Sequence, residues 1–565
     1  MIAISPEIRK KAADVCPTFA AQLEGLAIHA DDAVEFMQTA IHYGYLDRDT
    51  AGEIVAEAIG RTHVNLGKTL FQQDLIDKVP YELASSKKAI PLYKMGAVVT
   101  VAMVDPLDKK LISALELFLG SKVSPVFSFP DEVESAIVVK YHSPLEFDKL
   151  VDAFDFAPFL HADLTDAHLA ELMQSSQLVG MSDSLILMAL KERASDIHIE
   201  PKKHDLLIRF RVDGSLSERL VLPKNLALPL VSRFKIISGM DITNRRTPQD
   251  GRINFPLPIK NIDIRLSSLP TIHGEKLVLR MLGSPFAGTS LNLETLDIVP
   301  SLLTRLKQVI RQPNGILFVT GPTGCGKTTT LYAALNFINR PELNVITLED
   351  PVEYEWPSIN QVQVDEKAGR SFHILLRSVL RQDPDVILVG EIRDTETARI
   401  ATQAAMTGHL VLTTLHTNDA IQASTRLMDM GVERFMVAPS LIGVLNQRLV
   451  RRICPFCRVE HPPGEKNLSR FFTWREGATL PPFYRGEGCE RCNHTGYLGR
   501  IAIHEFLYIT HRLRDGLLGQ LNYHQLLEIA NSEGFHEMRY DGYKKALRGL
   551  TTLEEVIEAT MPETE

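Results

Sequence analysis

The pattern of apolar and polar positions changes character several times along the chain. Residues 1–60 place apolar side chains at helical spacing, as at 33–41, and this spacing predicts a small helical lobe. Residues 61–142 contain shorter apolar runs, such as 97–104, which lead into turn-type sequences. We interpret this second segment as an α+β docking domain, because it shows no catalytic pattern.

The next two segments have the pattern of a linker followed by another domain. Residues 143–179 begin with interleaved Asp and Phe and are interpreted as a linker. The aromatic side chains there, including Phe147 and Phe156, are expected to pack in part against a neighbouring domain. A helix-type run at 184–190 and strand-type alternation at 206–212 predict a second α/β domain over 180–285. The Gly, Pro and Ser residues at 283–290 favour a hinge, placed at 286–300.

Residues 301–565 show the pattern of a larger α/β domain. Apolar runs at 316–319 and 386–389 are typical of strands buried on both faces of a parallel sheet. A cysteine-containing lobe interrupts this domain at 451–499, and a helical tail follows. A chain of 565 residues is too long for one core, which agrees with several domains.

Composition narrows the class of protein. Hydrophobic residues make up 45% of the chain and charged residues 23%, as in folded globular proteins. A formal net charge of -9 argues against a protein that coats nucleic acid. The first fifteen residues have no apolar signal core, and no run of about 18 apolar residues occurs. We therefore expect a cytosolic protein.

The most informative stretch lies between a predicted strand at 316–319 and a predicted helix at 329–335. A strand, a glycine turn and a helix start form a cradle for polyphosphate, because backbone N–H groups wrap the phosphate oxygens. Lys327 is expected to reach the outer phosphates, and Thr328 to offer its hydroxyl to Mg²⁺. The predicted nucleotide-binding residues are Gly321, Pro322, Thr323, Gly324, Cys325, Gly326, Lys327, Thr328 and Thr329.

Acidic residues follow two of the predicted strands. In a parallel sheet they would face the nucleotide from the carboxyl ends of those strands. Glu353 is predicted to orient the attacking water, with Glu349 or Asp350 helping to hold metal-bound water. Glu391 is predicted to coordinate Mg²⁺, usually through water. Asp385, at the opposite end of its strand, is expected to form a cap or an ion pair.

Two histidines flank a further predicted strand at 410–415. His409 and His416 are seven residues apart, which places them on opposite faces and disfavours a shared metal site. His416, at the carboxyl end, is a candidate to contact the γ-phosphate, and a hydrogen-bonding histidine without that role is the alternative.

Four of the six cysteines form two Cys-x-x-Cys pairs, Cys454/Cys457 and Cys489/Cys492. In a reducing compartment such pairs indicate a tetrahedral zinc site with a structural role. The 31 residues between the pairs exceed the usual spacing of small zinc ribbons, and a redox role for the cysteines is the alternative.

The combined motifs resemble the type II secretion and type IV pilus assembly ATPases. The matching stretches include the glycine turn, the acidic box at 349–353, the box at 390–394 and residues 407–420. The likeness extends over roughly residues 180–565. It implies a P-loop (RecA-like) ATPase domain with an inserted zinc lobe, preceded by a PAS-like α/β domain, with ATP, Mg²⁺ and Zn²⁺ as ligands.

The same resemblance implies a homohexameric motor. Arg252 and Arg265 match the phosphate-sensing arginines by which one subunit closes on its neighbour's ATPase domain. Residues 61–142 look like the module that docks to an inner-membrane platform protein, with a cytoplasmic recruiter as a further partner and only peripheral membrane association. Asn65-Leu66-Gly67 lacks the arginine of a cyclic di-GMP motif, so that ligand is not predicted. Without the resemblance, the alternative is a P-loop nucleic-acid translocase.

Overall fold

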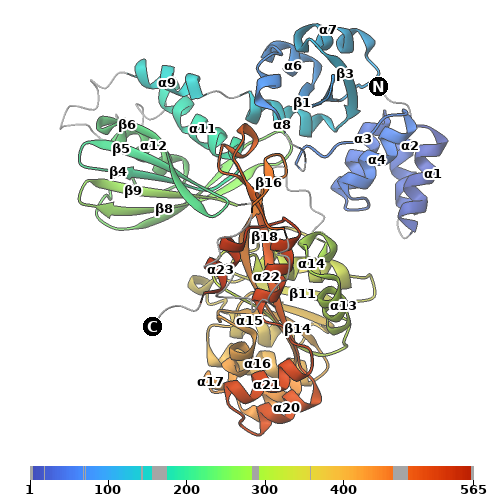
Figure 1. The fold of residues 1–565 in the computed structure, drawn as a ribbon, viewed down its shortest axis with the longest axis vertical. Coiled ribbons are helices and arrows are strands. Elements are labelled where there is room, and N and C mark those ends of the chain that lie inside the picture. The colour runs from blue at the N-terminus through green and yellow to red at the C-terminus, as the bar shows by residue number, and fades with distance from the viewer. Residues whose placement is uncertain are drawn as a thin grey trace, which may run out of the picture. The chain divides into compact units, whose positions relative to one another are not determined.

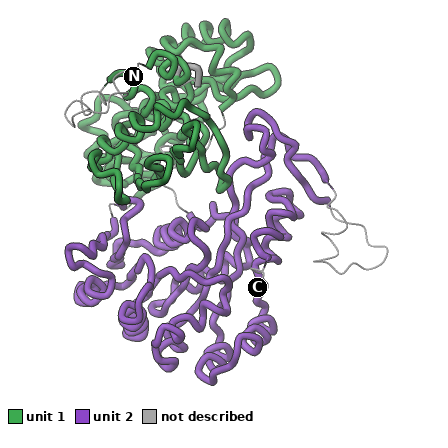
Figure 2. Tube along the Cα trace, turned by 90° about the vertical axis from the view of Figure 1, so that its left-hand side faces the viewer, with its two compact units in different colours: residues 1–289 green, residues 290–565 purple. Residues whose placement is uncertain are grey.

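A computed structural model shows two compact units, residues 1–289 and 290–565 (Figure 2). Each unit is considered by itself below. The structure describes residues 4–17, 20–67, 69, 71–141, 144–154, 175–282, 292–356, 358–461 and 482–561. Among these residues, no helix has the length and apolar character required to cross a membrane.

The first unit begins with four short helices that share a core with the domain after them. Phe127 and Phe129 of the following domain are fully buried against this bundle. Arg48 fixes the same junction from the surface, because its guanidinium forms two hydrogen bonds, of 3.0 and 2.8 Å, to the Asp131 carboxylate. The helices are α1 (Pro6–Val15), α2 (Ala20–His29), α3 (Ala33–His42) and α4 (Arg48–Ala58).

The next part of the first unit is a three-stranded sheet with helices around it. Strand β2 (Val98–Met103) is central, antiparallel to β1 (Ala89–Met95) and parallel to β3 (Lys122–Phe127). Leu115 and Val101 are among its fully buried core residues. The helices are α5 (Gln73–Ile76), α6 (Tyr81–Lys87), α7 (Lys109–Leu119) and α8 (Pro130–Lys140).

A six-stranded sheet completes the first unit, in the order β6-β5-β4-β9-β8-β7 with antiparallel neighbours (Figure 1). Its strands are β4 (Ala194–Pro201), β5 (Asp205–Val212), β6 (Ser215–Pro223), β7 (Gln249–Phe255), β8 (Ile262–Thr271) and β9 (Gly274–Leu282). Its helices are α11 (Ser176–Lys191) and α12 (Ala227–Ile237), with the short η3 (Lys224–Leu226).

The segment interpreted from sequence as a linker, 143–179, contributes to this core. It contains α9 (Pro144–Asp152) and the start of α11, and Phe147 and Phe154 are buried in the core of the six-stranded domain. The expected aromatic packing is therefore found, but a linker assignment for all of 143–179 is wrong, because these side chains belong to a folded domain. Phe156, Phe159 and the Gly-rich stretch 283–290 lie outside the described residues.

The second unit contains a seven-stranded sheet in the order β12-β11-β13-β14-β10-β15-β18. All neighbours are parallel except the edge strand β18, which is antiparallel to β15. The strands are β10 (Gly315–Thr320), β11 (Val345–Glu349), β12 (Asn360–Gln363), β13 (Val386–Val389), β14 (Leu410–Leu415), β15 (Leu441–Ile453) and β18 (Tyr497–Tyr508).

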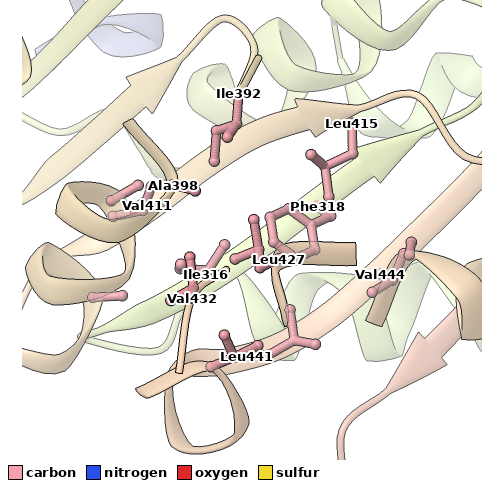
Figure 3. Packing of buried hydrophobic residues seen from close by; sticks show 14 of the residues in the cluster. Ile316, Phe318, Ile392, Ala398, Val411, Leu415, Leu427, Val432, Leu441 and Val444 are labelled. Atoms are coloured by element: carbon pink, nitrogen blue, oxygen red, sulfur yellow. The ribbon is translucent and has the colours of Figure 1, made fainter. Parts of the chain in front are cut away.

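Alternate residues of the central strand enter different cores on the two faces of this sheet. Ile316 and Phe318 pack into one core, with residues of α16, α17 and α18 (Figure 3). Leu317 and Val319 pack into the other, with residues of α13 and α14. The helices are α13 (Pro300–Val309), α14 (Lys327–Ile338), α15 (Phe372–Val379), α16 (Thr395–Met406), α17 (Ala420–Asp429), α18 (Arg434–Ser440), α20 (His511–Leu518), α21 (Tyr523–Ser532), α22 (Met538–Leu547) and α23 (Leu553–Thr560), with short η4 (Leu293–Leu296) and η5 (Glu366–Ala368).

The hinge expected at 286–300 is shorter than the sequence suggested. Leu293 and Ile298 are buried in the same core as α14, so residues from at least 293 onward belong to the second unit. A composition rich in small and polar residues did not reveal these two anchoring side chains.

The cysteine lobe lies between two long antiparallel strands. Strands β15 and β18 are paired from Gly443 opposite Tyr508 to Ile453 opposite Tyr497. The chain between them adds β16 (Arg458–Glu460), β17 (Tyr484–Gly486) and the short η6 (Glu490–Cys492). The lobe is therefore inserted between β15 and β18 and has its own two-stranded sheet, at the positions where the sequence placed an insertion.

Replacing Phe318 with Ala should destabilise the second unit by about 3–5 kcal/mol, because a fully buried aromatic ring is lost and a cavity remains. Thermal denaturation followed by calorimetry should show a lower transition temperature for this unit. Phe435→Ala is the matched control, since Phe435 is 66% exposed and its loss should change that temperature little. Equal effects of the two substitutions would contradict the core assignment.

Candidate active site

The glycine turn between β10 and α14 has a backbone that side chains would obstruct. Gly321, Gly324 and Gly326 have φ values of 136°, 77° and 90°, in the region that favours glycine. A Cβ atom on Gly321 would lie 2.3 Å from the carbonyl oxygen of Gln447. The turn therefore depends on glycine for both its conformation and its packing against β15.

The first residues of α14 bring the predicted phosphate ligands to the turn. The Lys327 ammonium donates to the carbonyl oxygens of Gly321 at 2.9 Å and Pro322 at 3.1 Å. Burial lowers the pKa of Lys327, against the opposing effect of the Glu391 carboxylate. Thr328 and Thr329 follow in the first turn of the helix, both partly buried, where unpaired backbone N–H groups and the helix dipole favour an anion.

Strand β15 supports this turn through two residues that the sequence analysis missed. The Gln447 amide donates to the carbonyl oxygen of Cys325 at 2.7 Å and accepts from the Thr330 hydroxyl at 2.8 Å. Asn446 accepts from the hydroxyl of Thr320, the last residue of β10, at 3.2 Å. Both amide side chains are buried. The sequence feature that could have indicated their role is the presence of two adjacent amides inside the apolar run 441–450.

Glu391 lies two residues after the end of β13 and close to two other predicted site residues. Its carboxylate forms an ion pair with Arg393, and its Oε2 lies 3.9 Å from His416 Nε2. Burial lowers the pKa of Lys327 and of His416, and the charge of Glu391 opposes this lowering in both. The ends of β10, β13 and β14 thus bring Lys327, Glu391 and His416 together.

Of the two histidines that flank β14, only His416 lies with Lys327 and Glu391. Burial and the charge of Lys327 lower the pKa of His416, which favours its neutral ring. His409 flanks the other end of β14, where its Nδ1 lies 2.9 Å from the Ala404 carbonyl oxygen. Because the two histidines lie at opposite ends of one strand, they are not placed to share a metal ion.

The acidic residues at the end of β11 differ in position: Glu349 is buried inside the domain, and Asp350 lies near the site. Glu349 is 4% exposed and accepts hydrogen bonds from the Tyr332 hydroxyl at 2.5 Å and the Thr347 hydroxyl at 2.6 Å. These contacts inside the domain favour Asp350 over Glu349 as the residue that helps to hold metal-bound water. Asp350 Oδ2 lies 3.7 Å from a guanidinium nitrogen of Arg393, which in turn pairs with Glu391.

Glu353 lies on the same loop with an exposed side chain. Burial is the largest cause that raises the pKa of Tyr354 and of Tyr332, and the charge of Glu353 raises both further.

Asp385 accepts a 2.7 Å hydrogen bond from the backbone N–H of Asn344, in agreement with its expected capping role.

Arg252 and Arg265 lie side by side on the six-stranded sheet of the first unit. They are directly paired across β7 and β8, and Arg265 is paired with Arg280 on β9. Paired residues of antiparallel strands project from the same face. Arg280 is held by Asp196, with 3.0 Å between the Arg280 Nε and an Asp196 oxygen. These arginines thus form a row on one face.

The four cysteines of the lobe form a compact cluster, with their sulfur atoms all within 4.8 Å of one another. Three of the distances, Cys454–Cys489, Cys457–Cys492 and Cys489–Cys492, are 3.8–3.9 Å. Tetrahedral zinc with four thiolates needs sulfur atoms about 3.8 Å apart, from a Zn–S distance of about 2.3 Å. The donor set and its spacing fit zinc, and Cys454 and Cys492 are buried, as in a closed structural site.

Comparison with known proteins agrees with this geometry. The sequence model described as "Type II/IV secretion system protein" matches residues 171–558. The chain belongs to this family. A second model, the MshEN domain, matches residues 59–145.

Relatives in this family carry names that point to secretion and pili. The chain is 39% identical over 93% of its length to "Type IV pilus assembly ATPase PilB" of Thermus thermophilus, and the match covers 59% of that longer protein. It is 45% identical over 75% of its length to "Type II secretion system protein HxcR" of Pseudomonas aeruginosa, covering 84% of that protein. The solved ATPase DotB of Yersinia pseudotuberculosis shares the fold, with 19% identity and a TM-score of 0.50 over 68% of this chain and 94% of that one.

Family membership confirms the predicted resemblance and the α/β fold with a P-loop. The chain is an ATPase of this family. Its residues also fit the implied magnesium ion, because the Thr328 hydroxyl and the Glu391 carboxylate are oxygen donors of the kind that Mg²⁺ prefers.

Replacing Lys327 with Ala should lower ATP hydrolysis at least about a hundredfold, because the cation at the phosphate turn is removed. Release of inorganic phosphate by the purified protein measures this effect. Lys367→Ala, which removes an exposed lysine of η5, is the matched control and should retain normal turnover. Full turnover by the Lys327 variant would refute the site.

Replacing Cys454 with Ser should remove zinc, because three thiolates cannot complete the tetrahedral set. Elemental analysis of the purified protein should give one zinc per chain before the substitution and far less after it. Cys16→Ser changes a cysteine outside the cluster and should leave the zinc content unchanged. Zinc-free wild-type protein would favour the redox alternative.

Proposed function

We propose that this chain is a cytoplasmic, hexameric motor that hydrolyses ATP to drive type IV pilus assembly or type II protein secretion at the inner membrane. The observation that carries this proposal is the meeting of Lys327, Glu391 and His416 at the carboxyl edge of the sheet. The names of the relatives supply the two candidate machines.

Each residue has a separate task in the proposed reaction. The glycine turn and Lys327 bind the phosphates, and Thr328 and Glu391 would hold Mg²⁺, which neutralises phosphate charge when bound. Glu353 orients the attacking water through its exposed carboxylate. The lowered pKa of His416 favours its neutral ring, which can donate a hydrogen bond to the γ-phosphate without adding a full charge.

The row of arginines completes the site between subunits. Arg252 and Arg265 would reach the γ-phosphate bound by a neighbouring subunit, as the family resemblance implies. A guanidinium is suited to this role because its planar donors match phosphate oxygens and stabilise the charge of the transition state. Pairing of the two residues across β7 and β8 supports a joint role.

The docking domain would place this motor at the membrane through protein partners. The MshEN match covers residues 59–145, next to the α1–α4 bundle whose core it shares. The proposed partners are an inner-membrane platform protein and a cytoplasmic recruiter. A nucleic-acid translocase is less favoured, because the formal net charge of -9 opposes binding to phosphate backbones.

Mixing two inactive variants tests the role of the arginines between subunits. Arg265→Ala and Lys327→Ala should each be inactive alone, but co-expressed chains should regain part of the activity. The reason is that some sites would pair an intact Lys327 with an intact Arg265 from the neighbour. Phosphate release by doubly tagged, co-purified complexes measures this recovery.

Lys203→Ala in place of Arg265→Ala is the control, since Lys203 is an exposed cation of the same domain and its loss should not reduce turnover. An absence of recovery in mixed complexes that are shown to contain both chains would contradict a site shared between subunits.

In the source organism, a chromosomal Lys327→Ala substitution should abolish surface pili or the export of secreted proteins while the protein persists at its normal level. Electron microscopy of the cell surface and analysis of the culture medium distinguish the two machines. Normal piliation together with normal secretion would overturn the proposed function.

A further inference from the structure

Helix α14 carries an aromatic side chain one turn after Thr328. Tyr332 is 1% exposed, although it ends in a polar hydroxyl. Its ring stacks on Trp356, with centroids 5.7 Å apart and planes 3° from parallel, and it meets Tyr354 edge to face at 5.6 Å. Both partners belong to the segment that follows Glu353.

The Tyr332 hydroxyl ties this helix to the start of the acidic loop. It donates a 2.5 Å hydrogen bond to Glu349, the last residue of β11. Burial and then the Glu349 carboxylate raise the pKa of Tyr332, so the hydroxyl keeps its proton throughout the physiological range. The hydroxyl is therefore protonated and donates this hydrogen bond from the phosphate-binding helix to the residue before Asp350.

Gln361 of β12 ties down the other end of the loop. Its amide nitrogen donates to the Tyr354 carbonyl oxygen at 2.8 Å, and its amide oxygen accepts from the Trp356 backbone N–H at 2.7 Å. The same amide nitrogen lies 3.3 Å from the Tyr332 hydroxyl. The residues between these two anchors, 350–353, include Glu353.

We propose that Tyr332 is a positioning residue that holds Glu353 in register with the phosphate-binding residues. Lys327, Thr328 and Tyr332 share one helix, so the hydrogen bond to Glu349 fixes the separation between the water-orienting carboxylate and the bound phosphates. This inference rests on the proposed role of Glu353. A displacement of about 1 Å in such a group can lower a rate about a hundredfold.

Tyr332→Phe separates this role from simple packing. Phenylalanine keeps the ring and its stacking on Trp356 but removes the hydroxyl. Oε1 of Glu349 retains Thr347 and Gln361 as donors and only Oε2 loses the Tyr332 hydroxyl, so the domain should still fold, with a modestly lower melting temperature. We expect kcat to fall about ten- to a hundredfold while KM for ATP and the affinity for ADP stay within about twofold.

Two further variants make the measurement decisive. Tyr508→Phe is the matched control, because Tyr508 is 41% exposed on β18 and its hydroxyl should not influence turnover. Glu353→Gln removes the proposed water-orienting carboxylate, and combining it with Tyr332→Phe should lower kcat little below Glu353→Gln alone. If Tyr332 acts through Glu353, the fold-losses of kcat in the two single variants should not multiply in the double variant.

Tryptophan fluorescence gives a readout independent of turnover. Trp356 and Trp474 are the only tryptophans, so a Trp474→Phe background leaves Trp356 as the sole reporter of the loop. Adding Tyr332→Phe should increase acrylamide quenching of Trp356 at temperatures well below the melting transition, because the loop has lost one anchor.

The outcomes separate this inference from the proposed function. Normal kcat for Tyr332→Phe, beside a strongly impaired Glu353→Gln, would overturn the positioning role and leave Glu353 in place. A raised KM, weaker ADP binding or a lower melting temperature with unchanged kcat would show a packing role only and would also overturn it. Normal turnover by Glu353→Gln would remove the role of Glu353, and the inference with it.

Discussion

The in-register pairing of parallel strands is the constraint on which the ATPase site depends. Thr320, at the end of β10, lies opposite Leu415 of β14 and Asn446 of β15, and Val389 of β13 lies opposite Thr413. Because these strands end at one edge, the residues that follow them must meet there. The acidic and basic groups of the site are thus brought together by hydrophobic strands that contain none of them.

The site is held in place by a buried polar layer just behind it. Asn446 and Gln447 bond to the end of β10 and to the glycine turn, and Tyr332 bonds to the end of β11. Buried polar groups of this kind are stable only when they are paired, which makes their geometry specific. The groups that would contact nucleotide lie at the surface, while the groups that orient them lie inside the domain.

Sequence reasoning predicted the parts of this site that are contiguous along the chain. The glycine turn needs a short run of residues with defined backbone freedom, and Glu391 and His416 could be placed because each lies within two residues of the end of an apolar strand. The partner of Glu349 could not be predicted, because Tyr332 reaches it from a helix 17 residues earlier in the chain. The segment that contains Phe147 was interpreted as a linker for a related reason, since composition alone does not show which core receives a side chain.

Strand β15 has a mechanical consequence for the cysteine lobe. One continuous strand, Leu441–Ile453, carries both the Gln447 carbonyl that restricts Gly321 and the residue just before Cys454. Tension applied at the cysteine cluster would therefore pass along covalent backbone to the residue that restricts Gly321. The strand thus gives the lobe and the glycine turn a direct mechanical connection.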